Sequence, residues 1–524
     1  MKHFVLCNYF FLWWVIATQP LLNAQPITSN EVDVLVERTM KTFNVPGIAV
    51  AIVKNGKVIH SKGYGVRSLQ TKQIVDPNTL FGIASNSKAF TTAALGILFD
   101  QGKLKWDDKV TKYIPEFKMY DAYVTKEFTI RDLLTHRSGL GLGAGDLMFW
   151  PASNDFTVKD VIYNLRFLKP VSGFRTKYDY DNLMYVLAGE VIARVSGNSW
   201  EDFIENHIML PLGMTASSAS FSRIKDKLNV IDPHAPLNGK VQVLMRDFRE
   251  TTNAASGIYS NLTDLCKWVK MHLNNGIISV VPAQRLLSKQ VHDEMWTSQT
   301  IMPVKGTSGY NTHFASYGLG WRLNDVKGYK QISHTGGLAG IVTQVTLIPE
   351  LTLGIIVLTN QQESAAYMSI TNTIKDSYLG ITGVDRIKQN SENRISSQSS
   401  AQKIINEVVK VLDTQKKLSF TEQDMAPYVG IYTDNWFGDI IISVKKGKLW
   451  FDSKRSPRLT GQMFPYKDNT FVVKWNDRFM DADAFVMFTK ENTGKASQIK
   501  MKAISPFTDF SFDFQDLDFQ RVKN

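Results

Sequence analysis

A serine and a lysine three positions apart, Ser85 and Lys88, stand in the segment ASNSKAFTTAALGILFDQG. A serine hydroxyl becomes an effective nucleophile only when a base takes its proton. Residues three apart on a helix share one face, so the lysine amine can reach back to the serine oxygen. We therefore interpret Ser85 as a candidate nucleophile and Lys88 as its base, provided that burial lowers the pKa of the lysine.

The spacing Ser-x-x-Lys alone does not identify a site, because it occurs five times, starting at Ser85, Ser222, Ser400, Ser443 and Ser497. The last four copies lie in a charged stretch, in a Ser-rich stretch and beside predicted β-turns. Only the first opens an apolar helix, predicted from Ser85 to Gln101, whose first amides could stabilise an oxyanion. For the tetrapeptide by itself, a helix N-cap followed by a solvated lysine stays an open alternative.

Two later segments carry groups that could complete such a site. Tyr180 and Asn182 precede an apolar helical pattern, and a tyrosine can relay a proton if neighbouring cations lower its pKa. The segment SHTGGLAG follows a predicted strand and contains His334, Gly336 and Gly337. Its glycines permit close approach of an acyl group to backbone N–H groups.

The elements around these residues predict an α+β domain over residues 25–387. VPGIAVAIVKNGKVIHSKGYG reads as two strands joined by a turn at Asn55-Gly56. A helical middle follows, and strands return in YKQISHTGG, GIVTQVTLIPE and LTLGIIVLTN. We expect an antiparallel sheet flanked by helices, with a helical subdomain.

The composition changes after residue 387. QNSENRISSQSSAQ is polar and Ser-rich, and KIINEVVKVLDTQKKL is amphipathic, so a linker and a helix are expected over residues 388–420. Short alternating strands then fill residues 421–524, which predicts a small all-β module, either a sandwich or a barrel. Two domains also suit a length of 524 residues.

The first 24 residues are typical of a secretory signal. Lys2 precedes an apolar run from Phe4 to Ala17, and a cut after Ala24 is expected. We therefore expect export to the periplasm or beyond, and we expect no membrane span because no other stretch approaches ~20 apolar residues. Cys7 would leave with the signal, so Cys266, predicted to be a buried helix thiol, would have no intramolecular disulfide partner.

Composition argues against several other functions. The net charge of +11 is spread over the chain without a dense Lys/Arg block, which disfavours nucleic acid as a partner. The sequence has no H-E-x-x-H motif and no Cys/His ligand cluster, which argues against a metallohydrolase.

The order S-x-x-K, Y-x-N, H-T-G resembles the penicillin-binding-protein and β-lactamase superfamily. More specifically, the chain is similar to class C β-lactamase-like serine hydrolases, which include esterases, D-aminopeptidases and DD-carboxypeptidases. PGIAVAIVKNGKV, TIRDLLTHRSGL, YDYDNLMYVLAGEVIARVSG, SGIYSNLTDLCKW and YGLGW carry this likeness in order, over about residues 30 to 385. The C-terminal module resembles the lipocalin-like barrels appended to some of these hydrolases.

The resemblance implies a role for each candidate residue. Ser85 would be acylated, with Lys88 as general base and Tyr180 relaying protons. Asn182 would bind the substrate amide, and the backbone amides of Ser85 and Gly337 would form the oxyanion hole. A second Y-x-N, at Tyr259, falls in a phrase that forms a structural turn in the family. The family uses no metal and no organic cofactor, so small-molecule or peptide acyl substrates are the expected partners.

One departure from the family pattern concerns the substrate. True β-lactamases have lysine where this chain has His334, and a largely neutral histidine offers a substrate carboxylate a weaker, pH-dependent contact. We therefore expect a serine hydrolase of ester or amide substrates, including D-amino-acid peptides. The alternatives are a true β-lactamase or DD-carboxypeptidase, and a non-catalytic relative that binds peptides or cell-wall fragments.

Overall fold

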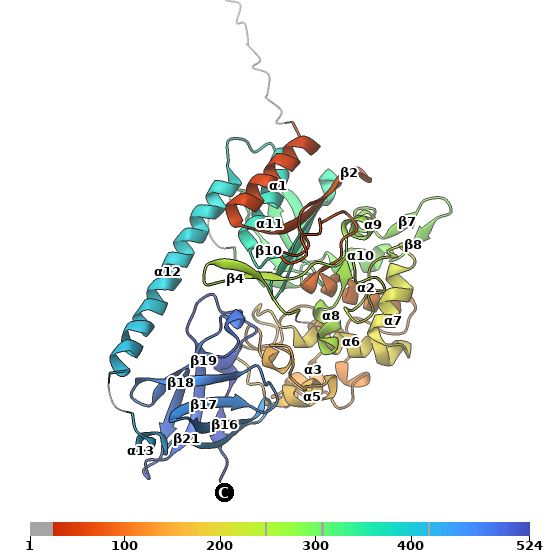
Figure 1. Cartoon of the computed structure of the whole chain (residues 1–524). Helices are drawn as coiled ribbons and strands as arrows, with labels where there is room; N and C mark the ends of the chain where they lie inside the picture. Colours follow the sequence, from red (N-terminus) through yellow and green to blue (C-terminus); the bar gives the residue numbers. More distant parts are fainter. Residues whose placement is uncertain (1–24, 247–248, 305–308, 418–419, 524) are drawn as a thin grey trace, which may run out of the picture.

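Two bodies joined by a long helix make up the chain (Figure 1). The structure is a computed structural model that describes residues 25–246, 249–304, 309–417 and 420–523. The predicted secretory signal, residues 1–24, lies outside the described residues.

The larger body is built on an antiparallel sheet of eight strands in the order β2-β1-β14-β13-β12-β11-β10-β9. These strands are β1 Gly47–Lys54, β2 Lys57–Gly65, β9 Thr300–Met302, β10 Ala315–Tyr317, β11 Arg322–Val326, β12 Tyr329–Leu338, β13 Ile341–Ile348 and β14 Leu353–Thr359. The predicted turn between β1 and β2 is confirmed, because Asn55 and Gly56 have φ angles of 51° and 73°, as a type I′ hairpin requires. N-terminal and C-terminal strands thus share one sheet.

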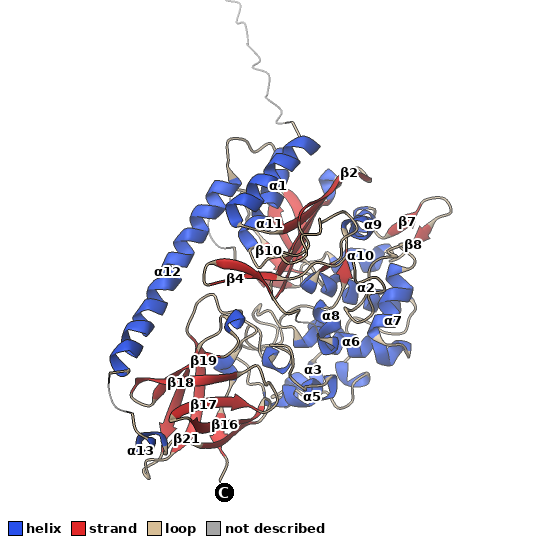
Figure 2. Cartoon of the chain, in the orientation of Figure 1, coloured by secondary structure: helices blue, strands red, loops and turns tan. Residues whose placement is uncertain are grey.

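Helices cover both faces of this sheet, so its central strands are buried on both sides (Figure 2). Along β1, Ile48, Val50 and Ile52 pack with helices α1 (Ser29–Phe43) and α11 (Ser364–Tyr378). The alternate residues Ala49, Ala51 and Val53 belong to the core shared with α2 (Ser87–Asp100) and α9 (Leu262–Leu273). This period of two along a strand explains why β1 reads as a continuous apolar run.

A helical region lies beside the α2 face of the sheet. Its helices are α3 Ala122–Glu127, α4 Ile130–Leu133, α5 Val158–Asn164, α6 Leu183–Ser196, α7 Trp200–Ile204, α8 Asn253–Ser256 and α10 Lys289–Met295. The larger body also contains three small two-stranded sheets. They are β3 Phe81–Gly82 with β6 Tyr259–Ser260, β4 His234–Leu237 with β5 Lys240–Val243, and β7 Ile277–Ser279 with β8 Gln284–Arg285. The α+β architecture is as predicted.

The Ser-rich stretch differs from the linker that its composition indicates. Helix α12, Arg386–Gln415, runs through it without interruption. Its first turns contact α11, and Val408 and Leu412 near its end pack on Val472 of the second body. Contacts at both ends stabilise a helix whose middle is polar and exposed, which composition alone does not reveal.

The second body is a closed barrel of eight antiparallel strands, preceded by α13 (Glu422–Met425). The strands are β15 Gly430–Asp434, β16 Gly438–Lys445, β17 Lys448–Ser453, β18 Thr460–Lys467, β19 Thr470–Trp475, β20 Ala484–Lys490, β21 Ala496–Ala503 and β22 Phe519–Arg521. Alternate side chains such as Ile440, Ile442 and Phe451 fill the interior. Of the two predicted all-β forms, the barrel is the one observed.

Two further sequence expectations concern single features. Cys266 is a free, buried thiol on α9, as predicted, and burial raises its pKa to about 12. Within the described ranges, no helix is long and apolar enough to cross a membrane.

Candidate active site

A cavity of about 440 Å³ opens between the sheet, the helical region and one loop of the barrel. The sequence-predicted residues Ser85, Tyr180, Asn182, His334, Gly336 and Gly337 all line it. Lys88 lies directly behind Ser85 and is fully buried. The structure therefore brings together every candidate residue of the sequence, from segments about 250 residues apart.

Ser85 lies in a short 3-10 turn, Ala84–Asn86, that leads into α2. Helix α2 itself begins at Ser87, two residues later than the apolar pattern predicts. Ala84 adopts a φ of 51°. This left-handed conformation is unfavourable for any residue that carries a Cβ atom. This turn leaves the Ser85 side chain partly exposed to the cavity, whereas its neighbours on both sides are buried.

Lys88 holds its amine against the serine. Its Nζ donates hydrogen bonds to the Ser85 hydroxyl at 3.1 Å, to Oδ1 of Asn182 at 2.7 Å and to the Ala255 carbonyl at 3.0 Å. Burial lowers the pKa of Lys88 to about 7, although the carboxyl groups of Asp146 and Asp181 oppose this change. A lysine with this pKa can accept a proton near neutral pH, which an exposed lysine rarely does.

Tyr180 faces the same point from the loop that precedes α6. Its ring centroid lies 4.8 Å from the Lys88 Nζ, and its hydroxyl has no hydrogen-bond partner in the described structure. Burial raises the pKa of Tyr180 well above its usual value, and the nearby Ser85 hydroxyl opposes this only in part. Proton relay through a lowered tyrosine pKa, as the sequence suggests, is therefore not what the structure shows: Tyr180 is a neutral phenol whose buried hydroxyl lies near Ser85.

The other tyrosine with the same motif is placed differently. Tyr259 lies in β6, where its neighbour Ser260 and its own backbone pair with Phe81 and Gly82 of β3. It contributes to a small core cluster with Leu80 and is absent from the described lining of the Ser85 cavity. Its position agrees with the expected structural role, although Tyr259 lies in a strand rather than in a turn.

Both polar atoms of the Asn182 amide form hydrogen bonds within the protein. While its Oδ1 accepts from Lys88, its Nδ2 donates to Oδ2 of Asp146 at 2.8 Å. The family resemblance implies that this amide binds the substrate. Both of its ends are already engaged in the structure, so its first effect is to orient the Lys88 amine.

His334 carries no charge in the structure. Its Nδ1 lies 2.7 Å from the Thr335 carbonyl, which can only accept, so this nitrogen holds the proton and Nε2 accepts from the Tyr317 hydroxyl at 2.9 Å. Burial lowers the pKa of His334 well below its usual value. With both nitrogens engaged, the pH-dependent contact to a substrate carboxylate that the sequence suggests has no free ring atom to make it.

The two candidate glycines have different reasons to be glycine. A Cβ on Gly336 would lie 2.3 Å from the Ile83 carbonyl and 2.9 Å from the Ala84 Cβ. A Cβ on Gly337 would meet nothing within 4 Å. Gly336 therefore lets β12 pack against the turn that holds Ser85, while the backbone of Gly337 borders open cavity space.

Arg322, which the sequence analysis did not single out, supplies the cation that His334 lacks. It lies in β11 opposite Ser333, one strand from His334, and lines the cavity. Among the described residues it forms no ion pair with a carboxylate, and its Nε has no hydrogen-bond partner. Nearby tyrosines outweigh burial and raise its pKa further, so it stays charged. The sequence feature that could have identified Arg322 is its position directly after YGLGW, one of the segments that carry the family resemblance.

A barrel segment also reaches the site, and no sequence pattern indicated it. Asp509, Phe510 and Ser511 line the cavity, and the Phe510 ring packs edge-on against Tyr180 with centroids 5.8 Å apart. The Ser511 hydroxyl donates to Oδ2 of Asp146 at 2.8 Å. The second body thus contributes part of the cavity wall.

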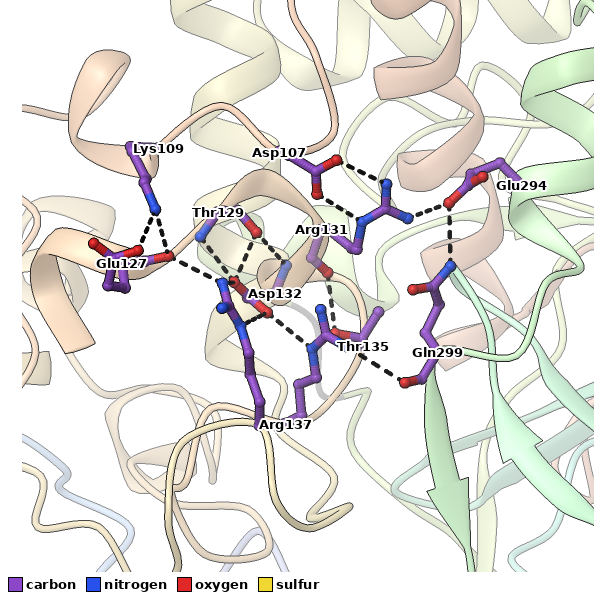
Figure 3. A network of polar contacts seen from close by, with 11 residues as sticks. Asp107, Lys109, Glu127, Thr129, Arg131, Asp132, Thr135, Arg137, Glu294 and Gln299 are labelled. Carbon is purple, nitrogen blue, oxygen red and sulfur yellow. Dashed lines mark hydrogen bonds and ion pairs between the residues drawn. The ribbon is translucent and has the colours of Figure 1, made fainter. Parts of the chain in front are cut away.

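An ion-pair network centred on the buried Asp132 (Figure 3) reaches the loop that precedes Tyr180. Asp132 is fully buried and pairs with Arg137 at 2.8 Å and Arg175 at 2.6 Å. Between these two arginine-bearing segments, His136 accepts a hydrogen bond from the backbone N–H of Asp181 at 3.0 Å. The network and the His136 contact therefore hold the loop 175–181, which presents Tyr180.

Comparison with protein families gives two matches. Residues 32–379 match the Beta-lactamase family, which covers more than half of the chain. Residues 414–521 match a family described as "Domain of unknown function (DUF3471)". The second match coincides with the end of α12 and the barrel.

Curated relatives align with the larger body. The chain is 28% identical over 346 residues to "Unguisins hydrolase ungD'" of Aspergillus campestris (strain IBT 28561), covering 64% of this chain and 62% of that protein. It is 29% identical over 336 residues to "Protein flp" of Staphylococcus aureus (strain NCTC 8325 / PS 47), covering 64% and 63%. The alignments span less than two thirds of these relatives.

Solved structures share the fold. "Structure of the octameric penicillin-binding protein homologue from Pyrococcus abyssi" superposes with a TM-score of 0.59 at 22% identity, covering 94% of this chain and all of that one. "A class C beta-lactamase" gives a TM-score of 0.55 at 23% identity, covering 68% and 97%. The first of these spans both bodies of the present chain.

Proposed function

The chain belongs to the Beta-lactamase family, and from this premise we propose that it is a serine hydrolase that cleaves ester or amide bonds through a Ser85 acyl-enzyme. One observation carries the proposal: the fully buried Lys88 amine, with a pKa of about 7, lies 3.1 Å from the Ser85 hydroxyl. A poised base beside a partly exposed serine is the arrangement that nucleophilic catalysis needs.

The proposed reaction has two stages. The Ser85 Oγ bonds to the acyl carbon as its proton passes to Lys88, and the bond to the leaving group breaks as Lys88 passes that proton through the Tyr180 hydroxyl to the leaving group. Water then attacks the acyl carbon and gives a proton to the neutral Lys88, and Lys88 returns this proton to the Ser85 oxygen as the bond from that oxygen to the acyl carbon breaks. Because Tyr180 is a neutral phenol, its hydroxyl can donate and accept in the same step.

The developing oxyanion requires donors beside Ser85. The backbone amides of Ser85 and Gly337 are the proposed pair, since both residues border the cavity and Gly336 brings β12 against the Ser85 turn. The proposal includes no metal and no organic cofactor.

Arg322 favours substrates that carry a carboxylate. A guanidinium that has no carboxylate partner among the described residues can offer a substrate carboxylate two parallel N–H donors, which neutral His334 does not. A peptide ending in a free carboxylate, including a D-amino-acid peptide, is therefore the preferred substrate class. β-Lactamase and DD-carboxypeptidase action stay alternatives, as both substrates carry such a group.

Labelling with a fluorescent fluorophosphonate tests the nucleophile. We expect covalent labelling of the wild-type chain, a modified peptide that contains Ser85, and no labelling of Ser85→Ala. Ser87→Ala is not a suitable control because the Ser87 hydroxyl is buried and bonded to the Ile258 amide, so Ser400→Ala, at an exposed serine, serves instead. Equal labelling of wild type and Ser85→Ala would contradict the proposal, and a complete lack of labelling and turnover would favour a non-catalytic binding protein.

A substrate panel then separates the alternatives. Turnover of p-nitrophenyl esters, D-amino-acid amides, peptide acids and nitrocefin is compared between wild type and Ser85→Ala. Nitrocefin turnover as fast as that of simple esters would support the β-lactamase alternative. Export remains part of the proposal, and N-terminal sequencing of the mature protein after expression tests the cut after Ala24.

A further inference from the structure

The barrel segment at the cavity is docked by specific contacts. The Asp513 carboxylate accepts hydrogen bonds from the backbone N–H groups of Gly145 at 2.6 Å and Leu147 at 2.9 Å. Gly143 has a φ of 69°, and a Cβ at this position would lie 2.7 Å from the Phe510 carbonyl. The loop 143–147 of the hydrolase domain and the segment 510–513 of the barrel therefore fit one another closely.

From this interface a continuous chain of hydrogen bonds leads to the nucleophile. Ser511 donates to Asp146 at 2.8 Å, Asn182 donates to the same Asp146 oxygen at 2.8 Å, and Lys88 donates to Asn182 at 2.7 Å. Lys88 also reaches Ser85 at 3.1 Å. Asp146 and Lys88 are wholly buried, and Ser511 and Asn182 are more than 90% buried, so water does not compete with these bonds.

The Asp146 carboxylate decides which way the Asn182 amide points. An asparagine side chain can present either its oxygen or its NH₂ group, and the two orientations differ only by a flip. Oδ2 of Asp146 accepts from both Ser511 and Asn182, so it selects the orientation with Nδ2 toward Asp146 and Oδ1 toward Lys88. The reverse orientation would aim two N–H donors at an ammonium group.

We propose that Ser511 of the barrel is a positioning residue for the hydrolase site: its hydroxyl holds Asp146, which orients Asn182 toward Lys88. This inference rests on the proposed Ser85–Lys88 site and goes beyond it, because it makes the barrel a working part of that site. Ser511 touches neither Ser85 nor Lys88, so its effect passes through Asp146 and Asn182.

The charges around Asp146 give this role a measurable consequence. Burial raises the pKa of Asp146 well above its usual value, while the hydrogen bonds from Asn182 and Ser511 oppose that change. Among the described residues, the other buried carboxyl groups nearby are Asp181, Asp513 and Asp509. Asp509 accepts a hydrogen bond from the Ser511 backbone N–H at 2.9 Å. The cations are Lys88 and Arg322, and the buried imidazoles of His136 and His334 are neutral. Loss of the Ser511 donor favours the neutral form of Asp146, and Lys88 then loses a charge that raises its pKa.

The test compares Ser511→Ala with Ser511→Thr, which keeps the hydroxyl. Ser505→Ala is the matched control, since Ser505 lies in the same connection and bonds only locally, to the Phe507 amide. For Ser511→Ala we expect kcat on a p-nitrophenyl ester to fall ~10-fold and the acid limb of kcat/KM to move down by about 0.5 to 1 pH unit. Ser511→Thr should restore both, and the melting temperatures should stay close together.

A second readout does not depend on turnover. NMR titration of ¹³Cε-labelled lysine, with the Lys88 signal assigned by Lys88→Arg, should show a lower midpoint in Ser511→Ala than in Ser505→Ala. An unchanged midpoint and acid limb in Ser511→Ala would overturn the inference, even if Ser85-dependent turnover is present. A shifted midpoint without any Ser85-dependent turnover would support the positioning role and contradict the proposed function.

Discussion

Lys88 Nζ lies closer to Asn182 Oδ1, at 2.7 Å, than to the Ser85 hydroxyl, at 3.1 Å. The amine is therefore held mainly by the amide and by the Ala255 carbonyl, and the serine takes its third donor. Since an ammonium has three N–H bonds, this arrangement leaves none for any other group. When Lys88 loses a proton, its nitrogen has a free lone pair, and this lone pair can accept the proton of the Ser85 hydroxyl.

The activity should follow the ionisation of Lys88. Only the neutral amine can act as a base, so kcat/KM on an aryl ester should rise with pH through about 7, where Lys88 loses its proton. Lys88→Arg places a group there that stays protonated, and kcat should fall by ~100- to 10,000-fold. The surface variant Lys112→Arg is the control and should retain wild-type rates. A flat profile between pH 5 and 9, or an active Lys88→Arg, would argue against Lys88 as the base.

Arg322 should control selectivity for carboxylates. For a peptide ending in a free carboxylate, Arg322→Ala should lower kcat/KM by ~100-fold, which corresponds to about 2 to 3 kcal/mol for the loss of a desolvated charge contact. For the same peptide ending in an amide, the change should be small. Arg322→Lys should recover part of the preference, because it restores the charge but not the two-pronged geometry. Equal losses on the acid and the amide would assign Arg322 a structural role instead.

The sequence predicted the larger part of the site because each motif lies on a recognisable element. Ser85 and Lys88 stand at the start of an apolar helix, Tyr180 precedes another, and Gly336 and Gly337 end a strand pattern. The sheet and the all-β character of the C-terminal module followed from alternating strands in the same way, whereas the choice of a barrel over a sandwich came from the family resemblance. Local periodicity carries this information, and the ordered motifs of a family supply the pairing between distant segments.

The rest of the site depends on contacts that no local pattern contains. Ser511 and Asp146 are 365 residues apart, and neither lies in a motif. Arg322 is an ordinary charged residue in a strand until the fold leaves it beside a cavity without a carboxylate partner among the described residues. The composition of the polar part of α12 is typical of a linker. The contacts that stabilise this helix lie at its two ends and cannot be recognised from that composition. Such features arise from tertiary structure and can be found only there.

Asp132 should matter for stability and for its dependence on pH. Burial alone would raise its pKa, but the hydrogen bonds from Arg175 and Thr129 and the charge of Arg137 outweigh this and lower it. A lowered folded-state pKa stabilises the fold above the unfolded value of about 3.9, and this contribution is lost as pH falls through the folded-state pKa. Asp132→Asn should therefore lower the free energy of unfolding by about 3 kcal/mol at pH 7. This value is at the lower end for breaking a buried ion pair, because Arg175 is partly exposed.

The control lies in the same network. Asp107 pairs with Arg131 but is 73% exposed, so Asp107→Asn should cost under about 1 kcal/mol. Chemical denaturation at pH 7 and at about pH 2.5, below the unfolded-state value of about 3.9, measures both variants. The difference between wild type and Asp132→Asn should shrink toward acid pH, and a difference that grows instead would contradict the sign of the pKa change. If Asp107→Asn matched Asp132→Asn in cost, burial would not be the cause.

Gly336 and Gly337 should respond differently to the same substitution. In Gly336→Ala the added methyl group would lie 2.3 Å from the Ile83 carbonyl, so either β12 or the turn that holds Ser85 must move. A shift of even 1 Å at a nucleophile can lower the rate ~100-fold. We expect that loss in kcat on an aryl ester, together with a fall in melting temperature.

Gly337→Ala is the matched control, since its methyl group meets nothing within 4 Å and the backbone N–H is retained. Its melting temperature and its labelling by fluorophosphonate should stay near wild type, and any effect on bulky substrates would reflect the methyl group in the cavity. The melting temperature of Gly336→Ala distinguishes two roles of Gly336, contact with the substrate and positioning of the nucleophile. A stable Gly336→Ala that loses activity only on large substrates would mean that Gly336 borders the substrate, whereas joint loss of stability and of Ser85 labelling would show that it positions the nucleophile.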